Sequence, residues 1–149
     1  MMTSIQIFTG TMSGTAEGVA EVVAQRLQAL GYTAEVNLRP DAAALLRNPN
    51  EIILICTSNT GSGDLPDDIQ PLYLELTRSY PAIAGRRYGC INLGDSCYTT
   101  FNEGGAALDA AFADLGAVRI GEPLVIDASE GEDPEALALA WLEEWVTLL

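Results

Sequence analysis

Residues 51–56 read Glu-Ile-Ile-Leu-Ile-Cys, so every residue after the glutamate is apolar. An uninterrupted apolar run of this length, rich in β-branched residues, is typical of a parallel strand that is buried on both faces. A strand of this kind lies in the centre of a sheet whose two faces are covered by helices. The run therefore favours an α/β fold over the other fold classes.

Strand and helix patterns alternate along the rest of the chain. We expect strands where β-branched residues gather and helices where apolar residues recur every three or four positions. The expected strands are 3–8, 32–38, 51–56, 87–93 and 117–126, the last interrupted near Pro123, and the expected helices are 15–30, 40–47, 69–80, 105–115 and 134–149. This alternation predicts one domain, residues 1–149, built as a three-layer fold with a five-stranded parallel sheet and helices on both faces. Trp141 and Trp145, four residues apart on the last helix, are expected in the core.

The charge composition excludes several kinds of chemistry. The net charge is -14, from 21 acidic and 7 basic residues, and all the basic residues are arginine because the chain contains neither lysine nor histidine. A Ser-His-Asp triad, a Schiff-base lysine, a P-loop lysine and a histidine-ligated zinc site are therefore all excluded. We expect no catalytic residues and no metal site. An acidic surface also repels nucleic acids and anionic membranes and favours a protein partner with a basic face, unless the acids serve solubility alone.

The chain shows no targeting or membrane signal. Its first residues lack a basic segment followed by an apolar one, and no apolar run approaches the roughly 20 residues of a membrane span. We expect a cytoplasmic protein with reduced thiols, in which Cys56 and Cys90 pack within strands and Cys97 lies in a loop.

The loop after the first strand has the composition of an anion-binding site. Small hydroxyl residues and glycines offer O–H and N–H donors at the positive end of the following helix dipole. Because the loop contains no lysine or arginine, it is not a Walker A loop, and it also lacks the G-x-G-x-x-G spacing. The alternative is an ordinary turn whose serine and threonine residues cap the helix. The residues concerned are Thr9, Gly10, Thr11, Met12, Ser13, Gly14 and Thr15.

Two further polar loops, 57–68 and 94–102, also follow expected strands. The carboxyl ends of parallel strands meet at one edge of a sheet, and ligands of open α/β sheets bind there, at the point where the strand order reverses. All three loops are therefore expected to contribute to one binding site.

These loops resemble those of the flavodoxins. Residues 9–16 resemble the phosphate loop of that family, residues 57–66 its first flavin loop, and residues 93–98 with Phe101 and Asn102 its second. The Thr-Gly-Ser-Gly-Asp-Leu-Pro-Asp segment is most similar to the short MioC-type flavodoxins and to the FMN domains of diflavin reductases. The resemblance covers the whole chain and implies strand order 2-1-3-4-5, noncovalently bound FMN and transfer of single electrons.

The same resemblance implies the residues that contact FMN. Thr11, Ser13, Gly14 and Thr15 would bind the phosphate, and Tyr98 would stack on the outer face of the flavin ring. Gly61 would let the peptide turn so that its carbonyl accepts the proton of flavin N5 after one-electron reduction. The full expected set is Thr9, Gly10, Thr11, Met12, Ser13, Gly14, Thr15, Ser58, Asn59, Thr60, Gly61, Ser62, Gly63, Asp64, Leu93, Gly94, Asp95, Tyr98, Phe101 and Asn102.

Two positions depart from the family pattern. Ala16 stands where the phosphate loop usually ends in a hydroxyl residue, so one bond to the phosphate is expected to be missing. Thr60 stands where many relatives stack an aromatic residue on the inner face of the flavin. Either Leu65 or another apolar group covers that face, or the face is more open and FMN is held less tightly.

The sequence thus predicts a low-potential one-electron carrier, not an enzyme. Its expected partners are a basic-faced redox protein, such as an NADPH-dependent flavodoxin reductase, and acceptor enzymes, and we expect a monomer. One alternative is a flavodoxin-fold interaction or regulatory module that has weakened or lost FMN binding. Another is a small FMN reductase acting on a molecule such as a quinone. Nine acids near the three loops are expected to disfavour a second electron and to steer the partner: Asp64, Asp67, Asp68, Asp95, Glu103, Asp127, Glu130, Glu132 and Asp133.

Overall fold

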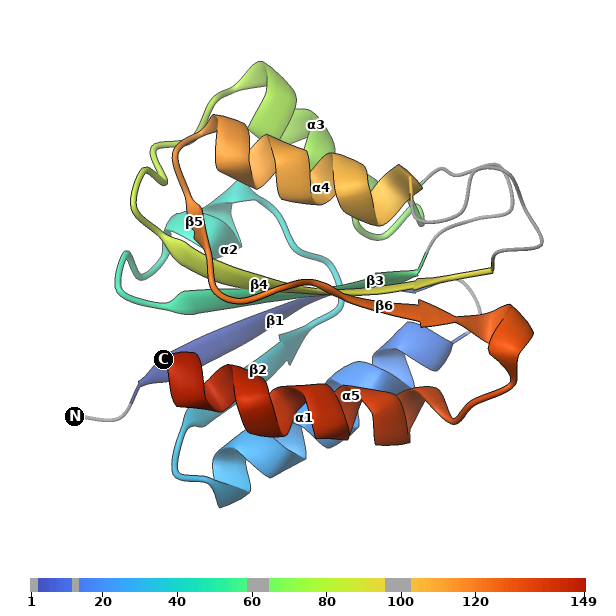
Figure 1. Ribbon diagram of the computed structural model, residues 1–149. Coiled ribbons are helices and arrows are strands. Elements are labelled where there is room, and N and C mark those ends of the chain that lie inside the picture. The colour runs from blue at the N-terminus through green and yellow to red at the C-terminus, as the bar shows by residue number, and fades with distance from the viewer. Residues whose placement is uncertain (1–2, 12–13, 59–64, 96–102) are drawn as a thin grey trace.

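Strands and helices alternate in the computed structural model, which describes residues 3–11, 14–58, 65–95 and 103–149 (Figure 1). The strands are β1 (Ser4–Gly10), β2 (Thr33–Asn37), β3 (Ile52–Ser58), β4 (Arg87–Gly94), β5 (Val118–Arg119) and β6 (Leu124–Asp127). The helices are α1 (Thr15–Ala29), α2 (Ala42–Leu46), α3 (Gln70–Arg78), α4 (Glu103–Asp114) and α5 (Pro134–Trp145), with short 3₁₀ turns η1 (Ala128–Glu130) and η2 (Val146–Leu148). Most of these elements begin and end within a residue or two of their predicted ends.

All strand pairs in the sheet are parallel, and the strand order is β2-β1-β3-β4-β5. The predicted fold class and strand order are therefore confirmed. The predicted fifth strand is divided into two short strands, because β5 pairs with the start of β4 and β6 pairs with its end. The interruption includes Pro123, which has no N–H to donate to a neighbouring strand.

Helices cover both faces of the sheet. Figure 1 shows α1 and α5 on one face and α2, α3 and α4 on the other. Successive side chains of a strand point to opposite faces, so β3 contributes to two cores. Ile52, Leu54 and Cys56 pack in the core beneath α1 and α5, while Ile53 and Ile55 pack in the core beneath α3 and α4. None of the described helices is both long and apolar enough to cross a membrane.

The two tryptophans hold the interrupted segment between β5 and β6. The side chain of Trp145 donates to the carbonyl of Ile120 at 2.9 Å, and that of Trp141 donates to the carbonyl of Glu122 at 3.1 Å. Trp145 is buried and Trp141 is partly buried against the same core, as predicted. The Trp145 ring lies so close to β4 that a Cβ on Gly89 would come within 2.8 Å of it, so this position requires glycine.

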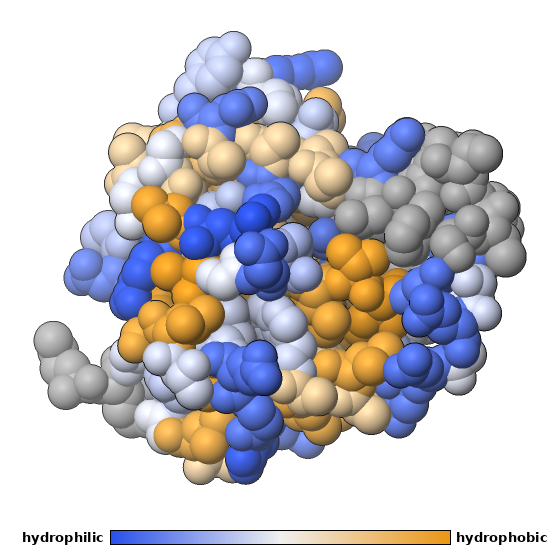
Figure 2. Space-filling view, viewed as in Figure 1, coloured by the Kyte–Doolittle hydropathy of each residue, from blue (hydrophilic) through white to orange (hydrophobic). Residues whose placement is uncertain are grey.

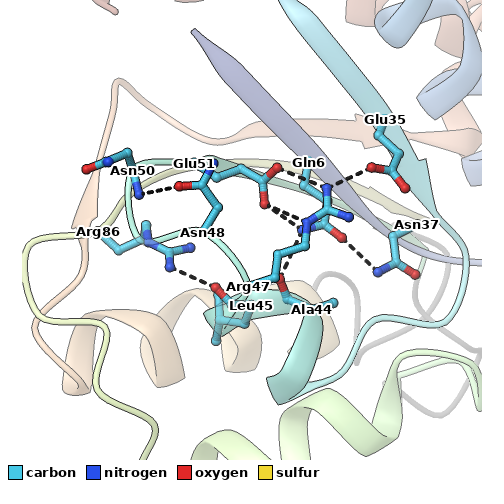
Figure 3. A network of polar contacts seen from close by, with 10 residues as sticks. All are labelled: Gln6, Glu35, Asn37, Ala44, Leu45, Arg47, Asn48, Asn50, Glu51 and Arg86. Atoms are coloured by element: carbon cyan, nitrogen blue, oxygen red, sulfur yellow. Dashed lines mark hydrogen bonds and ion pairs between the residues drawn. The ribbon is translucent and has the colours of Figure 1, made fainter.

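A polar network closes the amino edge of the sheet (Figure 3). The buried Glu51 carboxylate, just before β3, accepts from Gln6 Nε2 of β1 at 2.8 Å and from Arg47 Nε and Nη2 at 3.2 and 3.0 Å. Arg47 Nη2 also pairs with Glu35 of β2 at 2.7 Å. These contacts raise the pKa of Arg47 above its ordinary value. The network therefore joins β1, β2, β3 and the end of α2 through one buried carboxylate.

Arg86 also holds α2 at the amino edge of the sheet. Its Nη2 donates to the carbonyl of Leu45, in the last turn of α2, at 2.7 Å. The residue is 6% exposed, and burial lowers the pKa of its guanidinium while the nearby Glu51 carboxylate opposes that shift. A five-residue helix is too short to be stable alone, so these side-chain bonds fix its position.

We expect Arg47→Met to lower the free energy of unfolding by about 2 kcal/mol, since it removes the cation that hydrogen-bonds the buried Glu51 carboxylate. The full cost of breaking a buried pair is reduced here because the Arg47 side chain is 41% exposed. Urea denaturation measures the change. The matched control is Arg26→Met, which breaks the exposed pair with Glu143 and should leave the midpoint unchanged. Equal losses in the two variants would contradict this role for the network.

Candidate functional site

The carboxyl ends of three neighbouring strands meet at one edge of the sheet. Gly10 of β1 is in register with Thr57 of β3, and Ser58 of β3 with Leu93 of β4. The Ser58 hydroxyl donates to the carbonyl of Gly10 at 3.4 Å. The chain segments that lead into all three predicted loops therefore lie side by side.

The described part of the first loop places N–H groups at the start of α1. Gly14 is the N-cap residue, with a φ of 90° that favours glycine, and a Cβ at this position would have no neighbour within 4 Å among the described residues. The N–H of Gly14 donates to the hydroxyl of Thr11 at 2.9 Å. Thr15 is exposed at the first position of the 15-residue helix. This arrangement puts hydroxyl and N–H groups at the positive end of a helix dipole.

A carboxylate from another segment is hydrogen-bonded to this loop. The main-chain N–H of Thr11 donates to both oxygens of Asp68, at 3.1 and 3.2 Å. Asp68 comes from the segment that precedes α3, far away in sequence. An N–H group that donates to a carboxylate of the protein itself has the chemistry needed to donate to a phosphate oxygen. The sequence placed Asp68 among the steering acids and did not reveal this contact.

Other predicted site residues are buried within the strands. Thr9 has no exposed surface, and its hydroxyl donates to the carbonyl of Ile7 at 3.3 Å. Leu93 is also buried and packs in the core. A Cβ on Gly10 would come within 2.6 Å of the Ile69 side chain, so glycine is needed here for packing of β1 against the start of α3. The side chains of Thr9 and Leu93 are therefore buried at the strand ends from which the first and third loops begin.

Ala16 is buried as well, which gives its departure from the family pattern a structural reason. Its methyl group has no exposed surface and belongs to the core beneath α1, and its carbonyl accepts from the Cys56 thiol at 3.5 Å. Burial raises the pKa of Cys56 to about 12 and also raises that of Cys90, so both thiols stay protonated at neutral pH. The prediction that these two cysteines pack within strands is confirmed.

Several predicted residues lie outside the described residues. These are Met12, Ser13, Asn59, Thr60, Gly61, Ser62, Gly63, Asp64, Cys97, Tyr98, Phe101 and Asn102. The second loop is described again from Leu65, which is 7% exposed and packs in the core beneath α3 and α4. Gln70 Nε2 donates to the Leu65 carbonyl at 2.8 Å and so ties the end of this loop to the start of α3.

Asn92 and Gly105 shape the base of the third loop, and sequence patterns did not identify them. Asn92 is 2% exposed, and its Oδ1 has no hydrogen-bond partner in the part of the chain that the structure describes. A Cβ on Gly105 would clash with that side chain, so this position requires glycine. The start of α4 therefore lies directly on the end of β4.

Two surface cavities of about 470 Å³ each flank the edge. One lies between α3 and α4 and includes Leu65, Tyr73, Leu74 and Glu103 in its wall. The other is lined by Arg39, Pro40, Asp41, Asp67, Asp68 and Pro71. Within residues 3–11, 14–58, 65–95 and 103–149, no group of three or more acidic or cysteine side chains is placed to hold a metal ion.

Comparison with known proteins identifies the family. The flavodoxin family model matches residues 7–141. The chain belongs to the flavodoxin family. It is 43% identical over 148 residues to flavodoxin YqcA of Escherichia coli K12, with 99% of both chains covered, and 35% identical over 150 residues to protein MioC of the same strain, again with 99% of both covered. A solved cysteine-to-serine variant of a Pseudomonas aeruginosa flavodoxin superposes with a TM-score of 0.90 at 39% identity, covering 98% of each chain.

The flavodoxins are electron-transfer flavoproteins. The described donors fit the phosphate of such a cofactor, since Thr11, Gly14 and Thr15 are neutral and lie at a helix N-terminus. The carboxylate of Asp68 on the Thr11 N–H opposes a phosphate at this loop, because both are negatively charged.

We expect Ala16→Thr to lower the free energy of unfolding by about 1 to 3 kcal/mol, because it forces a larger side chain and a hydroxyl into a filled core. Urea denaturation again provides the measurement. Ala140→Thr makes the same chemical change at an exposed position of α5 and should cost less than about 0.7 kcal/mol, the difference in helix propensity. Similar losses at both positions would show that the core beneath Ala16 has room for the extra atoms.

Proposed function

We propose that this flavodoxin binds FMN noncovalently at the carboxyl edge of its sheet and acts as a low-potential one-electron carrier between a reductase and acceptor enzymes. When bound, FMN supplies a ring that takes up and releases single electrons. The observation that carries the proposal is the loop between β1 and α1, whose described residues place neutral hydroxyl and N–H groups at a helix N-terminus. We further propose that the protein acts as a monomer in the cytoplasm, as expected from its sequence.

The phosphate would be held by Thr11, Ser13, Gly14 and Thr15. Hydroxyl and main-chain N–H groups hydrogen-bond a dianion, and the α1 dipole favours its charge. Ser13 lies outside the described residues and enters this set through the family resemblance alone. Binding in this way requires no lysine or arginine in the loop.

The ring would lie between the second and third loops. Residues 58–64 would follow one edge of the ring, with Gly61 providing the peptide that responds to its protonation at N5, and Tyr98 would stack on its outer face. The third loop would also contact FMN through Gly94, Asp95, Phe101 and Asn102. The Leu65 side chain is directed into the core, so it offers little cover to an inner face that Thr60 leaves without an aromatic ring.

Binding is tested by the absorption spectrum of the purified protein before and after adding FMN and removing the excess. We expect retained flavin with shifted, structured visible bands, since a ring buried against an aromatic side chain absorbs differently from one in water. Folding is checked in parallel by circular dichroism. A folded protein that retains no flavin would contradict the carrier and favour the interaction module.

The acids around the site support a basic-faced partner such as an NADPH-dependent flavodoxin reductase. Hydrophilic residues gather where β6 leads into η1 and the start of α5 (Figure 2). Asp127 and Asp133 cap η1 and α5 by accepting from the N–H groups of Ser129 and Glu135. Glu130 and Glu132 are exposed and cap neither element in the part of the chain that the structure describes, which suits them to long-range steering.

Steering is tested with Asp67→Lys combined with Glu132→Lys in the FMN-loaded protein. Both residues are exposed at the carboxyl edge. We expect reduction by a basic-faced flavodoxin reductase to slow by about tenfold at low salt and to depend less on ionic strength. Stopped-flow absorbance provides the rate.

The matched control is Asp114→Lys combined with Glu144→Lys. These two residues are also exposed, but they lie near the ends of α4 and α5, at the opposite edge of the sheet. The control changes the net charge equally and should leave the rate nearly unchanged. If both variants slow alike, net charge matters and the position of the acids does not.

A further inference from the structure

Asp68 and its neighbour Asp67 differ in their burial and in their contact with the loop after β1. Its carboxylate accepts the Thr11 N–H through both oxygens, and the side chain is partly buried. Asp67 is exposed on the surface. Adjacent acids with the same charge therefore face the phosphate loop differently, one in contact with it and the other directed to water.

The surroundings of Asp68 are negative. It lines one cavity together with Asp41 and Asp67, and Arg39 is the cation of that cavity wall. Asp41 accepts the N–H of Ala44 as the cap of α2, so its carboxylate is fixed in place. Three carboxylates and one guanidinium leave a net negative charge beside the loop, which repels an approaching dianion.

Two N–H groups of the loop have partners within the protein among the described residues. The Thr11 N–H is bonded to Asp68, and the Gly14 N–H is bonded to the Thr11 hydroxyl. A phosphate at this loop must therefore either displace the Asp68 carboxylate or accept its charge as a close neighbour. Both alternatives lower the affinity for phosphate.

We propose that Asp68 is a positioning residue that sets the phosphate affinity of the loop after β1. Its oxygen holds the Thr11 main chain in place, and its charge weakens binding of the FMN phosphate. This proposal rests on the proposed function, because the phosphate concerned is that of FMN. The carboxylate thus orders the loop while keeping its affinity for the cofactor below what neutral donors would give.

The test separates the charge of Asp68 from its hydrogen bond. Asp68→Asn keeps an oxygen that accepts the Thr11 N–H and removes the charge. We expect FMN to bind about tenfold more tightly, since a unit charge close to a dianion is removed. Riboflavin, which lacks the phosphate, should bind as it does to the parent protein. Fluorescence titration measures both dissociation constants.

Three controls complete the design. Asp67→Asn makes the same change one residue away, on an exposed side chain whose charge water and salt screen, and should change FMN affinity by less than about twofold. Asp68→Ala removes the acceptor as well and should bind FMN more weakly than Asp68→Asn. Inorganic phosphate should raise the melting temperature of Asp68→Asn more than that of the parent, because a ligand stabilises the form it binds.

The outcomes distinguish this proposal from the proposed function. If Asp68→Asn and the parent bind FMN with equal affinity, the proposed role of Asp68 is overturned and the proposed carrier function is unaffected. The same holds if riboflavin affinity rises as much as FMN affinity in Asp68→Asn, or if Asp67→Asn gains as much FMN affinity as Asp68→Asn. Equal affinities of Asp68→Ala and Asp68→Asn would overturn the positioning role. If the parent retains no FMN, the carrier is contradicted, and the response to inorganic phosphate alone supports or overturns the role of Asp68.

Discussion

Residues Ile52 to Thr57 of β3 are all buried, so their main-chain N–H and C=O groups depend on neighbouring strands for hydrogen bonds. Parallel pairing with β1 on one side and β4 on the other supplies those bonds. Parallel strands require crossover connections, and the helices of these connections cover the two apolar faces. Every loop that leaves a strand at its carboxyl end is thereby brought to one edge.

The two edges of the sheet stabilise buried or partly buried carboxylates in different ways. At the amino edge, Glu51 is neutralised by Arg47, so the contact is firm and contributes to stability. At the carboxyl edge, Asp68 is bonded to a main-chain N–H, which carries only a partial charge. The negative charge of Asp68 therefore remains available to act on a ligand. Glu51 is thus neutralised by a bonded arginine, whereas Asp68 is bonded to a group that carries only a partial charge.

The sequence predicted most of the fold because hydrophobic periodicity reflects burial directly. The continuous run before Cys56, the spacing of α1 and the core position of Trp145 all follow from which side chains avoid water. The division of the last strand was indicated only by Pro123. β5 and β6 pair with different parts of β4. This arrangement depends on the Trp145 and Trp141 side chains, which hydrogen-bond main-chain carbonyls of the segment between the two strands.

Local patterns predicted an anion-binding loop after β1, since hydroxyl groups, glycines and a helix start are visible in the sequence itself. Tertiary structure alone decided that Thr9 and Ala16 face the core and that Asp68 reaches Thr11. Such contacts join residues distant in sequence, and their geometry depends on how α3 packs against β1. The sequence by itself therefore determined the architecture and predicted a loop with the composition of an anion-binding site, whereas packing decided which of the described loop residues are buried and which carboxylate lies beside them.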